Sequence, residues 1–322
     1  MPRERIRFAQ VRRHWSLYAL MVPTLVLVAM FMYLPAISGV YHSFYRWDGD
    51  ELATYVGMRN YRQAFGDPEL GWAFVRVGIL FGASLFKMVP SIVTAVVIHR
   101  ITRDRLRYFY RLLFVVPMVI PWMVGLLIWK FFYNPVVGLL NRFLSTTGIL
   151  DILAAMNTWA VKANVVESVI FQVGRNPAWL GDSDLALAAY IFWGFPWIGV
   201  IGVLIYLSGL EKIPHSVYEC ADLDGVGWFG KFLYIELPLI ATQVRINLVL
   251  LIIGVLKGYG LVLVLLGETG GPGGAVMVPG LYMYYNAFVK REAGYACAIG
   301  ILVFFVILAL TYVNNKLVRV ER

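Results

Sequence analysis

Apolar and polar segments alternate along the chain, and six of the apolar segments exceed 20 residues. A helix of about 20 apolar residues crosses a hydrocarbon core of roughly 30 Å. The predicted spans are residues 17–40, 73–98, 112–133, 184–209, 239–266 and 295–315. The pattern therefore predicts an all-α polytopic membrane protein with six transmembrane helices.

The composition agrees with a membrane protein. Hydrophobic residues make up 60% of the chain and charged residues 15%, against about 45–50% and 25% in soluble domains. The net charge of +9 does not point to nucleic acid as a partner, because the basic residues are scattered between apolar runs and would meet lipid headgroups. Cys220 and Cys297 are the only cysteines, too few for a disulfide framework.

Basic residues are concentrated on one side of the predicted spans. That side carries 15 Lys and Arg and the other side only eight, although the latter is longer. The basic segments are 1–16, 99–111, 210–238 and 316–322, and the opposite segments are 41–72, 134–183 and 267–294. The positive-inside rule then predicts that both termini are cytoplasmic.

The long outer segment contains a moderately apolar stretch from Ile149 to Val173. A seventh span is conceivable there. Lys162 and Glu167 would each cost about 2.5–3.5 kcal/mol near the bilayer centre, however, and another crossing would spoil the charge asymmetry. We therefore expect an outer or interfacial helix.

The loop between the fourth and fifth spans predicts two short helices. Ser216 and Glu219 form a capping box that would start the first helix, and Gly225 would end it. The second would run from Trp228 to Tyr234, before Pro238 opens the next span. Periodicity alone is equally consistent with a solvated helical hairpin that only joins two spans.

The spacing of particular residues in this loop resembles a known motif. Glu219-Cys220-Ala221, Gly225 and, after nine further residues, Ile235-Glu236-Leu237-Pro238 resemble the EAA loop of permease subunits of ATP-binding cassette (ABC) importers. The similarity extends through residues 111–141, 179–187, 207–214, 269–272 and 281–288. These segments look like the carbohydrate-uptake branch, in particular the subunit similar to the larger maltose permease. Cys220 departs from the usual Ala, and the outer segment near 150–175 is longer than usual.

The resemblance implies a type I ABC importer permease fold in the bacterial plasma (inner) membrane. Its organisation would be a cytoplasmic tail (1–16), a first transmembrane helix with an outer loop (17–72), a permease core (73–316) and a second cytoplasmic tail (317–322). Within the core, residues 209–238 would form the coupling loop. This loop would insert a short helix into a cleft on a cytoplasmic ATPase.

The implied partners are a second homologous permease subunit, a cytoplasmic ATPase dimer, an extracellular or periplasmic sugar-binding protein and an oligosaccharide. ATP and Mg²⁺ would bind to the ATPase, so that this chain is expected to be no enzyme and to bind no cofactor. Gly225 to Lys231 match the spacing of a phosphate-binding P-loop, but Phe232 stands where Ser or Thr would hold magnesium.

Two groups of candidate residues follow from the resemblance. The ATPase-coupling residues are Ser216, Glu219, Cys220, Ala221, Asp222, Asp224 and Gly225. The substrate-path residues, obtained by aligning on Pro196 and on the TGGP segment, are Tyr190, Trp193, Gly194, Trp197, Leu256, Lys257 and Gly260.

Chemistry supports part of the second group. Trp193 and Trp197 would lie one helical turn apart, where flat aromatic faces suit sugar rings, although both could equally pack against neighbouring helices. Lys87 and Lys257 are deep in their spans, and an intramembrane Lys usually faces a wet cavity. Of the two we favour Lys257. We hypothesise that an acidic, uronate-containing oligosaccharide neutralises its charge. The alternative is that Lys257 bonds to a backbone carbonyl or to a residue of the partner permease.

Other functions remain as alternatives. The permease could carry another small solute such as glycerol phosphate. A polytopic membrane transferase would need clustered acid-base or metal residues, whereas the four histidines are dispersed and the predicted spans contain no carboxylate pair. A secondary transporter would need inverted repeats, and the sequence has none that we detect.

Overall fold

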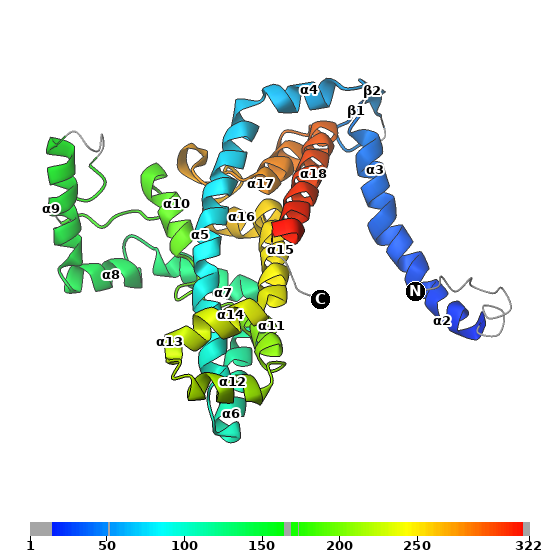
Figure 1. Cartoon of the computed structure of the whole chain (residues 1–322). Coiled ribbons are helices and arrows are strands. Elements are labelled where there is room, and N and C mark those ends of the chain that lie inside the picture. Colours follow the sequence, from blue (N-terminus) through cyan, green and yellow to red (C-terminus); the bar gives the residue numbers. More distant parts are fainter. Residues whose placement is uncertain (1–14, 51, 164–168, 173, 318–322) are drawn as a thin grey trace. The chain divides into compact units, whose positions relative to one another are not determined.

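A computed structural model describes residues 15–50, 52–163, 169–172 and 174–317 (Figure 1). The predicted cytoplasmic tails lie outside these residues, apart from 15, 16 and 317. The chain divides into two compact units, residues 1–66 with 286–301, and residues 67–285 with 302–322.

The smaller unit begins with a long helical segment. Its elements are α2 (Trp15–Val28), η1 (Ala29–Tyr33), α3 (Leu34–His42), β1 (Tyr45–Arg46), β2 (Thr54–Tyr55) and α4 (Arg59–Gly66). The first three form one helix of 28 residues, which confirms the first predicted span. The two strands pair antiparallel, with Tyr45 opposite Tyr55. Asn60 ties α4 to the end of α3 by donating to the carbonyl oxygens of Ser43 (2.8 Å) and Tyr45 (2.9 Å).

The larger unit is helical in its described residues. Its elements are α5 (Pro68–His99), α6 (Asp104–Val115), η2 (Val116–Val119), α7 (Trp122–Phe132), α8 (Leu139–Thr146), α9 (Ile149–Lys162), α10 (Ser183–Phe192), α11 (Val200–Leu210), α12 (His215–Leu223), α13 (Trp228–Lys231), η3 (Phe232–Glu236), α14 (Leu237–Leu239), α15 (Ala241–Lys257), α16 (Gly260–Leu266), η4 (Pro272–Gly274) and α17 (Pro279–Tyr284). The segments η5 (Tyr285–Val289) and α18 (Ala293–Leu317) complete the chain.

Two more predicted spans are continuous helices. α5 has 32 residues and α18 has 25, and both are long and apolar enough to cross a membrane. Asp67 caps α5, since its carboxylate accepts from the amides of Glu69 and Leu70, and Pro68 occupies the first turn, where no helical N–H is lost. The second and last spans are therefore confirmed.

The third and fifth predicted spans are interrupted, so the prediction of single helices there was wrong. Residues 104–119 and 122–132 meet at 84°, where Pro117 and Pro121 remove backbone donors. A bend of 70° precedes Ala241, and α15 ends at Lys257 before the short α16. Among the described residues, three helices can cross singly, or up to seven spans form if each bent pair is counted as one.

The fourth predicted span is also broken, near its middle. α10 and α11 have 10 and 11 residues, so each is about 15 Å long, half the hydrocarbon thickness. The break contains Gly194 and Trp197, both at positive φ (80° and 61°), and Pro196, which has no N–H to donate. Trp193 and Trp197 thus do not share a helical face, contrary to the prediction.

The long outer segment contains α8 and α9, which meet at 83°. α9 ends at Lys162, so the expected helix from Ile149 to Val173 is shorter than predicted. Its 14 residues extend about 21 Å, less than a bilayer core. Glu167, which the sequence argument used, lies outside the described residues.

α5 packs along α11 in the larger unit. Buried Ala95, Val96 and Ile98 of α5 form one cluster with Val203 and Leu207 of α11. Burial of such apolar side chains favours the association of two helices wherever their separated faces would be exposed to water. This cluster lies between the two parts of the candidate site.

Candidate functional site

The first part of the site is the coupling loop, whose first helix is α12. Gly225 follows this helix with a φ of 69°, which a residue with a side chain adopts only at a cost. Its N–H donates to Asp222 O (3.1 Å), and the next amide, of Val226, donates to Ala221 O (2.9 Å). These two bonds form a Schellman C-cap. The prediction that Gly225 ends the helix is confirmed.

The start of α12 differs from the prediction. The helix begins at His215 after Pro214, and no side chain caps it. Ser216 is already inside the first turn, and Glu219 pairs with His215 instead (3.5 Å). The expected capping box was therefore wrong, because Pro214 has a fixed φ and occupies the N-cap position itself.

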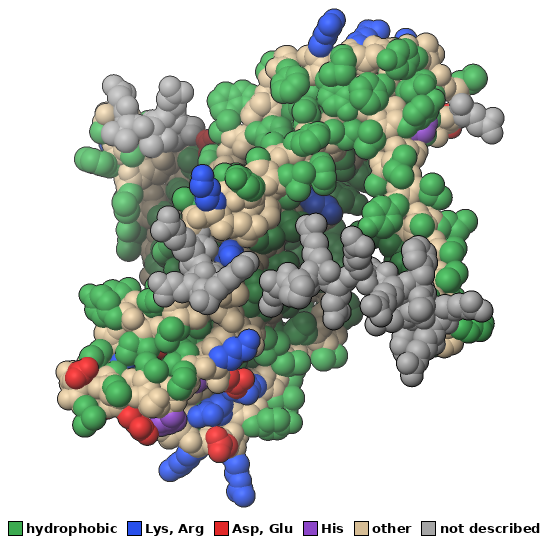
Figure 2. Space-filling view, turned by 45° about the vertical axis from the view of Figure 1, so that its right-hand side comes forward, with side chains coloured by type: hydrophobic (Ala, Val, Ile, Leu, Met, Phe, Trp, Pro, Cys, Tyr) green, Lys and Arg blue, Asp and Glu red, His purple; other side chains and the backbone are tan. Residues whose placement is uncertain are grey.

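α12 presents most of the predicted coupling residues to its surroundings. Ser216, Glu219, Cys220, Asp222, Asp224 and Gly225 are exposed. Ala221, by contrast, is buried and packs within this chain. Leu223, at the tip of the loop, is 89% exposed and was missed by the sequence argument. Charged side chains gather around this end of the larger unit, at the bottom of Figure 2.

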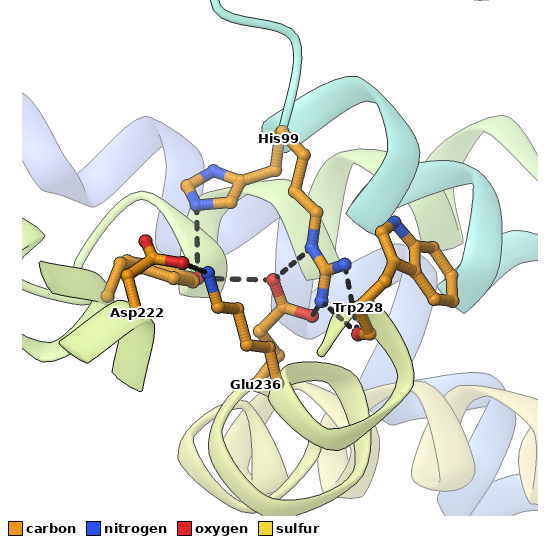
Figure 3. Close-up of polar contacts among 7 residues, drawn as sticks. His99, Asp222, Trp228 and Glu236 are labelled. Carbon is orange, nitrogen blue, oxygen red and sulfur yellow. Dashed lines mark hydrogen bonds and ion pairs between the residues drawn. The ribbon is translucent and has the colours of Figure 1, made fainter. Parts of the chain in front are cut away.

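The second helical segment of the coupling loop, which we call its second arm, is longer than predicted; the first arm is α12. Helical structure continues from Trp228 through Leu239, so Pro238 lies within the arm and α15 begins only at Ala241. Glu236 on this arm is fully buried. Its carboxylate accepts from Arg100 of α5 at both oxygens, with Nε–Oε1 at 2.9 Å and Nη2–Oε2 at 2.7 Å (Figure 3).

Tyr218 connects α12 to this ion pair. Its hydroxyl donates to Oε1 of Glu236 (3.3 Å) and also lies 3.3 Å from Nε2 of His99. Burial and the neighbouring Glu236 carboxylate raise the pKa of Tyr218, so that the hydroxyl keeps its proton and remains a donor. A second contact links the two arms directly, since Lys231 pairs with Asp222 (Figure 3).

The second part of the site is a cavity of about 670 Å³ beside the break between α10 and α11. We call it the central cavity. Its polar lining consists of Ser84, Lys87, Ser91, Trp193, Tyr206 and Asn247. Apolar side chains, among them Met88, Ile198 and Leu250, complete the wall. A concave, mostly apolar site with a few polar groups is the usual form of a small-molecule site.

Side chains of α5 satisfy the backbone groups that the break leaves without helical partners. Lys87 Nζ donates to Trp193 O (3.4 Å) and lies 5.7 Å from the centre of the Trp197 ring. Ser91 Oγ donates to Trp197 O (3.3 Å) and accepts from the amide of Gly199 (2.9 Å). Non-helical backbone at membrane depth is tolerated where such groups replace the helical bonds.

The predicted substrate-path residues divide into two sets. Trp193, Gly194 and Trp197 line the central cavity. The lining does not include Tyr190, Leu256, Lys257 or Gly260. Leu256 is buried and Lys257 is exposed at the end of α15. The structure thus assigns Lys87, rather than the favoured Lys257, to the cavity with the two tryptophans.

Further contributors that the sequence argument missed include Ser91, Asn247 and Arg100. Ser91 stands four residues after Lys87 on an apolar helix, a spacing that puts both side chains on one face and could have revealed it. Asn247 stands directly before the apolar run 248–256. Arg100 was read only as part of the cytoplasmic charge. In the part of the chain that the structure describes, no group of His, Cys, Asp or Glu is arranged to hold a metal.

Comparisons with known proteins give consistent matches. Residues 74–319 match the family of binding-protein-dependent transport system inner membrane components. A probable ABC transporter permease protein, YurN of Bacillus subtilis, is 31% identical over 93% of this chain and 94% of its own length. The trehalose/maltose transport system permease protein MalF of Thermococcus litoralis is 28% identical, over 95% and 94%.

A solved structure shares the fold. It is a chain from a bacterial ABC transporter involved in the import of the acidic polysaccharide alginate, superposed with a TM-score of 0.76. The match covers 97% of this chain and 98% of the other, at 21% sequence identity.

Proposed function

Because this chain belongs to the family of inner membrane components of binding-protein-dependent transport systems, we propose that it is the permease subunit that moves an oligosaccharide across a bacterial plasma membrane. Such a subunit forms the path for the cargo. It does not hydrolyse ATP, because a separate ATPase does so. The similarity to a trehalose/maltose permease over nearly the full length supports a sugar as cargo. We expect multiple crossings with both termini in the cytoplasm, as the charge asymmetry indicates.

Three protein partners complete the proposed transporter. They are a second homologous permease subunit, a cytoplasmic ATPase dimer and an extracellular or periplasmic sugar-binding protein. The exposed face of α12 supports docking on the ATPase, since Glu219 and Asp224 offer charge and Leu223 offers an apolar tip. An apolar anchor surrounded by polar groups is the usual composition of a protein interface.

The observation that carries the proposed path is the central cavity. Trp193 and Trp197 border it at a broken helix, and aromatic rings suit the apolar faces of sugars. Broken helices near the bilayer midplane are also where transporters commonly bind their substrates.

The charge of the cavity supports an acidic oligosaccharide, such as one that contains uronates. Among the described residues, no Asp or Glu forms an ion pair with Lys87, whose recorded partner is a carbonyl oxygen. A buried ammonium is costly unless an anion or dipoles face it. A carboxylated sugar would supply that anion. A phosphorylated solute such as glycerol phosphate is also an anion and is the alternative cargo.

The experiment uses the assembled transporter, purified through this chain and reconstituted in proteoliposomes with its binding protein. ATP hydrolysis is measured with an oligouronate, with the same oligosaccharide after reduction of its carboxyl groups, and with glycerol phosphate. We expect stimulation and uptake with the oligouronate only. Stimulation by the neutral sugar alone would contradict the proposal of an acidic cargo. Stimulation by glycerol phosphate alone would contradict the proposal of an oligosaccharide cargo. Purification without any ATPase would contradict the transporter itself.

A further inference from the structure

The ion pair between Arg100 and Glu236 joins two segments that lie 136 positions apart in the sequence. Arg100 is the C-cap of α5, and Glu236 ends the helical segment η3 on the second arm of the coupling loop. Side-chain exposure is 17% for Arg100 and 0% for Glu236. The pair is thus largely withdrawn from water, unlike most ion pairs at protein surfaces.

Every nitrogen of the Arg100 guanidinium has a partner. Besides the two bonds to Glu236, Nη1 and Nη2 donate to the carbonyl oxygen of Trp228 at 3.1 and 3.0 Å. The guanidinium also lies 4.5 Å from the centre of the Trp228 ring. The planar guanidinium makes two hydrogen bonds to the Glu236 carboxylate and stacks on the Trp228 ring. It therefore fixes both the distance and the direction of the contact, which the single ammonium of a Lys cannot do.

Glu236 also contacts the coupling helix. Oε1 accepts from Tyr218, which lies on α12 between the exposed residues proposed to dock on the ATPase. A displacement of α12 therefore reaches Glu236 through one hydrogen bond, and reaches Arg100 through the ion pair. The covalent route from α12 to α5 is far longer.

α5 carries this connection to the central cavity. Lys87 and Ser91, which hold the break between α10 and α11, lie on the same helix as His99, although Pro90 within it has no N–H to donate to the preceding turn. Arg100 lies thirteen positions after Lys87, a distance of about 20 Å along a helix axis. α5 remains one helix through Pro90, so it joins the cavity end and the loop end of this segment directly.

We propose that Arg100 and Glu236 form a latch that transmits movement of the coupling helix to α5, and through α5 to the wall of the substrate cavity. We treat both as positioning residues, since Glu236 is fully buried and the Arg100 guanidinium bonds only to groups of this chain among the described residues. A buried ion pair adds little stability compared with apolar packing of the same volume. Its fixed geometry instead holds the loop in one register on α5. This inference rests on the proposed docking of α12 on an ATPase.

The test measures the coupling ratio, the number of cargo molecules taken up per ATP hydrolysed, in proteoliposomes with the assembled transporter. Uptake by the wild type tests the proposed function separately, so the two ideas fail independently. In Glu236→Gln and Arg100→Lys, we expect the complex to hydrolyse ATP while the coupling ratio falls about fivefold or more, as loss of a coupling free energy predicts. A purely structural role would lower uptake and hydrolysis together and leave the ratio unchanged.

A double variant guards against misfolding. Arg100→Gln combined with Glu236→Gln leaves no uncompensated buried charge, so the complex should assemble, and its coupling ratio should still be low. The matched control is Arg107→Gln with Asp104→Asn, which removes a more exposed ion pair within α6 and should keep the wild-type ratio. A wild-type ratio in the double variant would overturn the latch. Failure of all three latch variants to assemble would also overturn it, because the pair would then serve folding alone.

Discussion

The hydroxyl of Ser91 lies 2.9 Å from the backbone nitrogen of Gly199 and accepts its hydrogen bond. The same hydroxyl donates to Trp197 O, so one small side chain on α5 serves both backbone groups at the start of α11. A serine can do this because its oxygen is both donor and acceptor. The break in the fourth span therefore takes these two hydrogen bonds from α5.

Removing this hydroxyl should destabilise the permease. We expect Ser91→Ala to cost about 0.5–1.5 kcal/mol, since a part-buried amide and carbonyl lose their hydrogen-bond partner. Thermal unfolding of the detergent-purified complex measures the loss. Ser84→Ala is the matched control, because Ser84 lines the same cavity from the same helix and makes neither bond. Equal melting temperatures for the two variants would contradict this role of Ser91.

Lys87 should determine the response to acidic cargo. Lys87→Gln keeps a donor for Trp193 O but loses the charge, and a hydrogen bond to a charged group is worth about 1.5–3 kcal/mol. The oligouronate concentration that half-stimulates ATP hydrolysis should rise about tenfold or more, since 1.4 kcal/mol is a factor of ten. Lys257→Gln, on the exposed end of α15, is the comparison. A loss in Lys257→Gln with none in Lys87→Gln would place the path away from the central cavity.

Gly225 should be required for coupling because of its backbone conformation. Its φ is 69°, and a side chain there would contact nothing within 4 Å, so strain is the only obstacle. We expect Gly225→Val to cost about 1–2 kcal/mol and to lower uptake per ATP. Gly227→Val is the control, because Gly227 has an ordinary φ of −68° and equally open surroundings. Normal coupling in both variants would show that the shape of the loop is unimportant.

Cysteine labelling tests the orientation in the membrane. Cys220 is exposed on α12, and in a Cys297→Ser background it should react with a membrane-impermeant maleimide only from the cytoplasmic side. Asp182→Cys, in the segment before α10, should react only from outside. If the Asp182→Cys variant reacts only from the cytoplasm, the proposed crossing of the fourth span is wrong.

Several features could be predicted from the sequence because they depend on neighbours along the chain. The apolar runs specify membrane helices, and charge asymmetry indicates their orientation, since solvation by lipid acts on each segment separately. Gly225 marks the end of α12 for a local reason, its positive φ. Pro196, two residues after Gly194, is also a local signal for the break in the fourth span. The sequence argument overlooked it because the surrounding residues are apolar.

Only the tertiary structure decided which distant groups meet. Lys87 and Lys257 are both deep in their predicted spans, and packing places Lys87 beside Trp193 while Lys257 is exposed. Arg100 is one of five arginines in its segment, and nothing in the local sequence selects it as the partner of Glu236. Hydrophobic periodicity identifies the face that a helix buries but not the helix that covers it. Contacts between residues more than 100 positions apart therefore arise from how α5 packs against α11 and against the coupling loop.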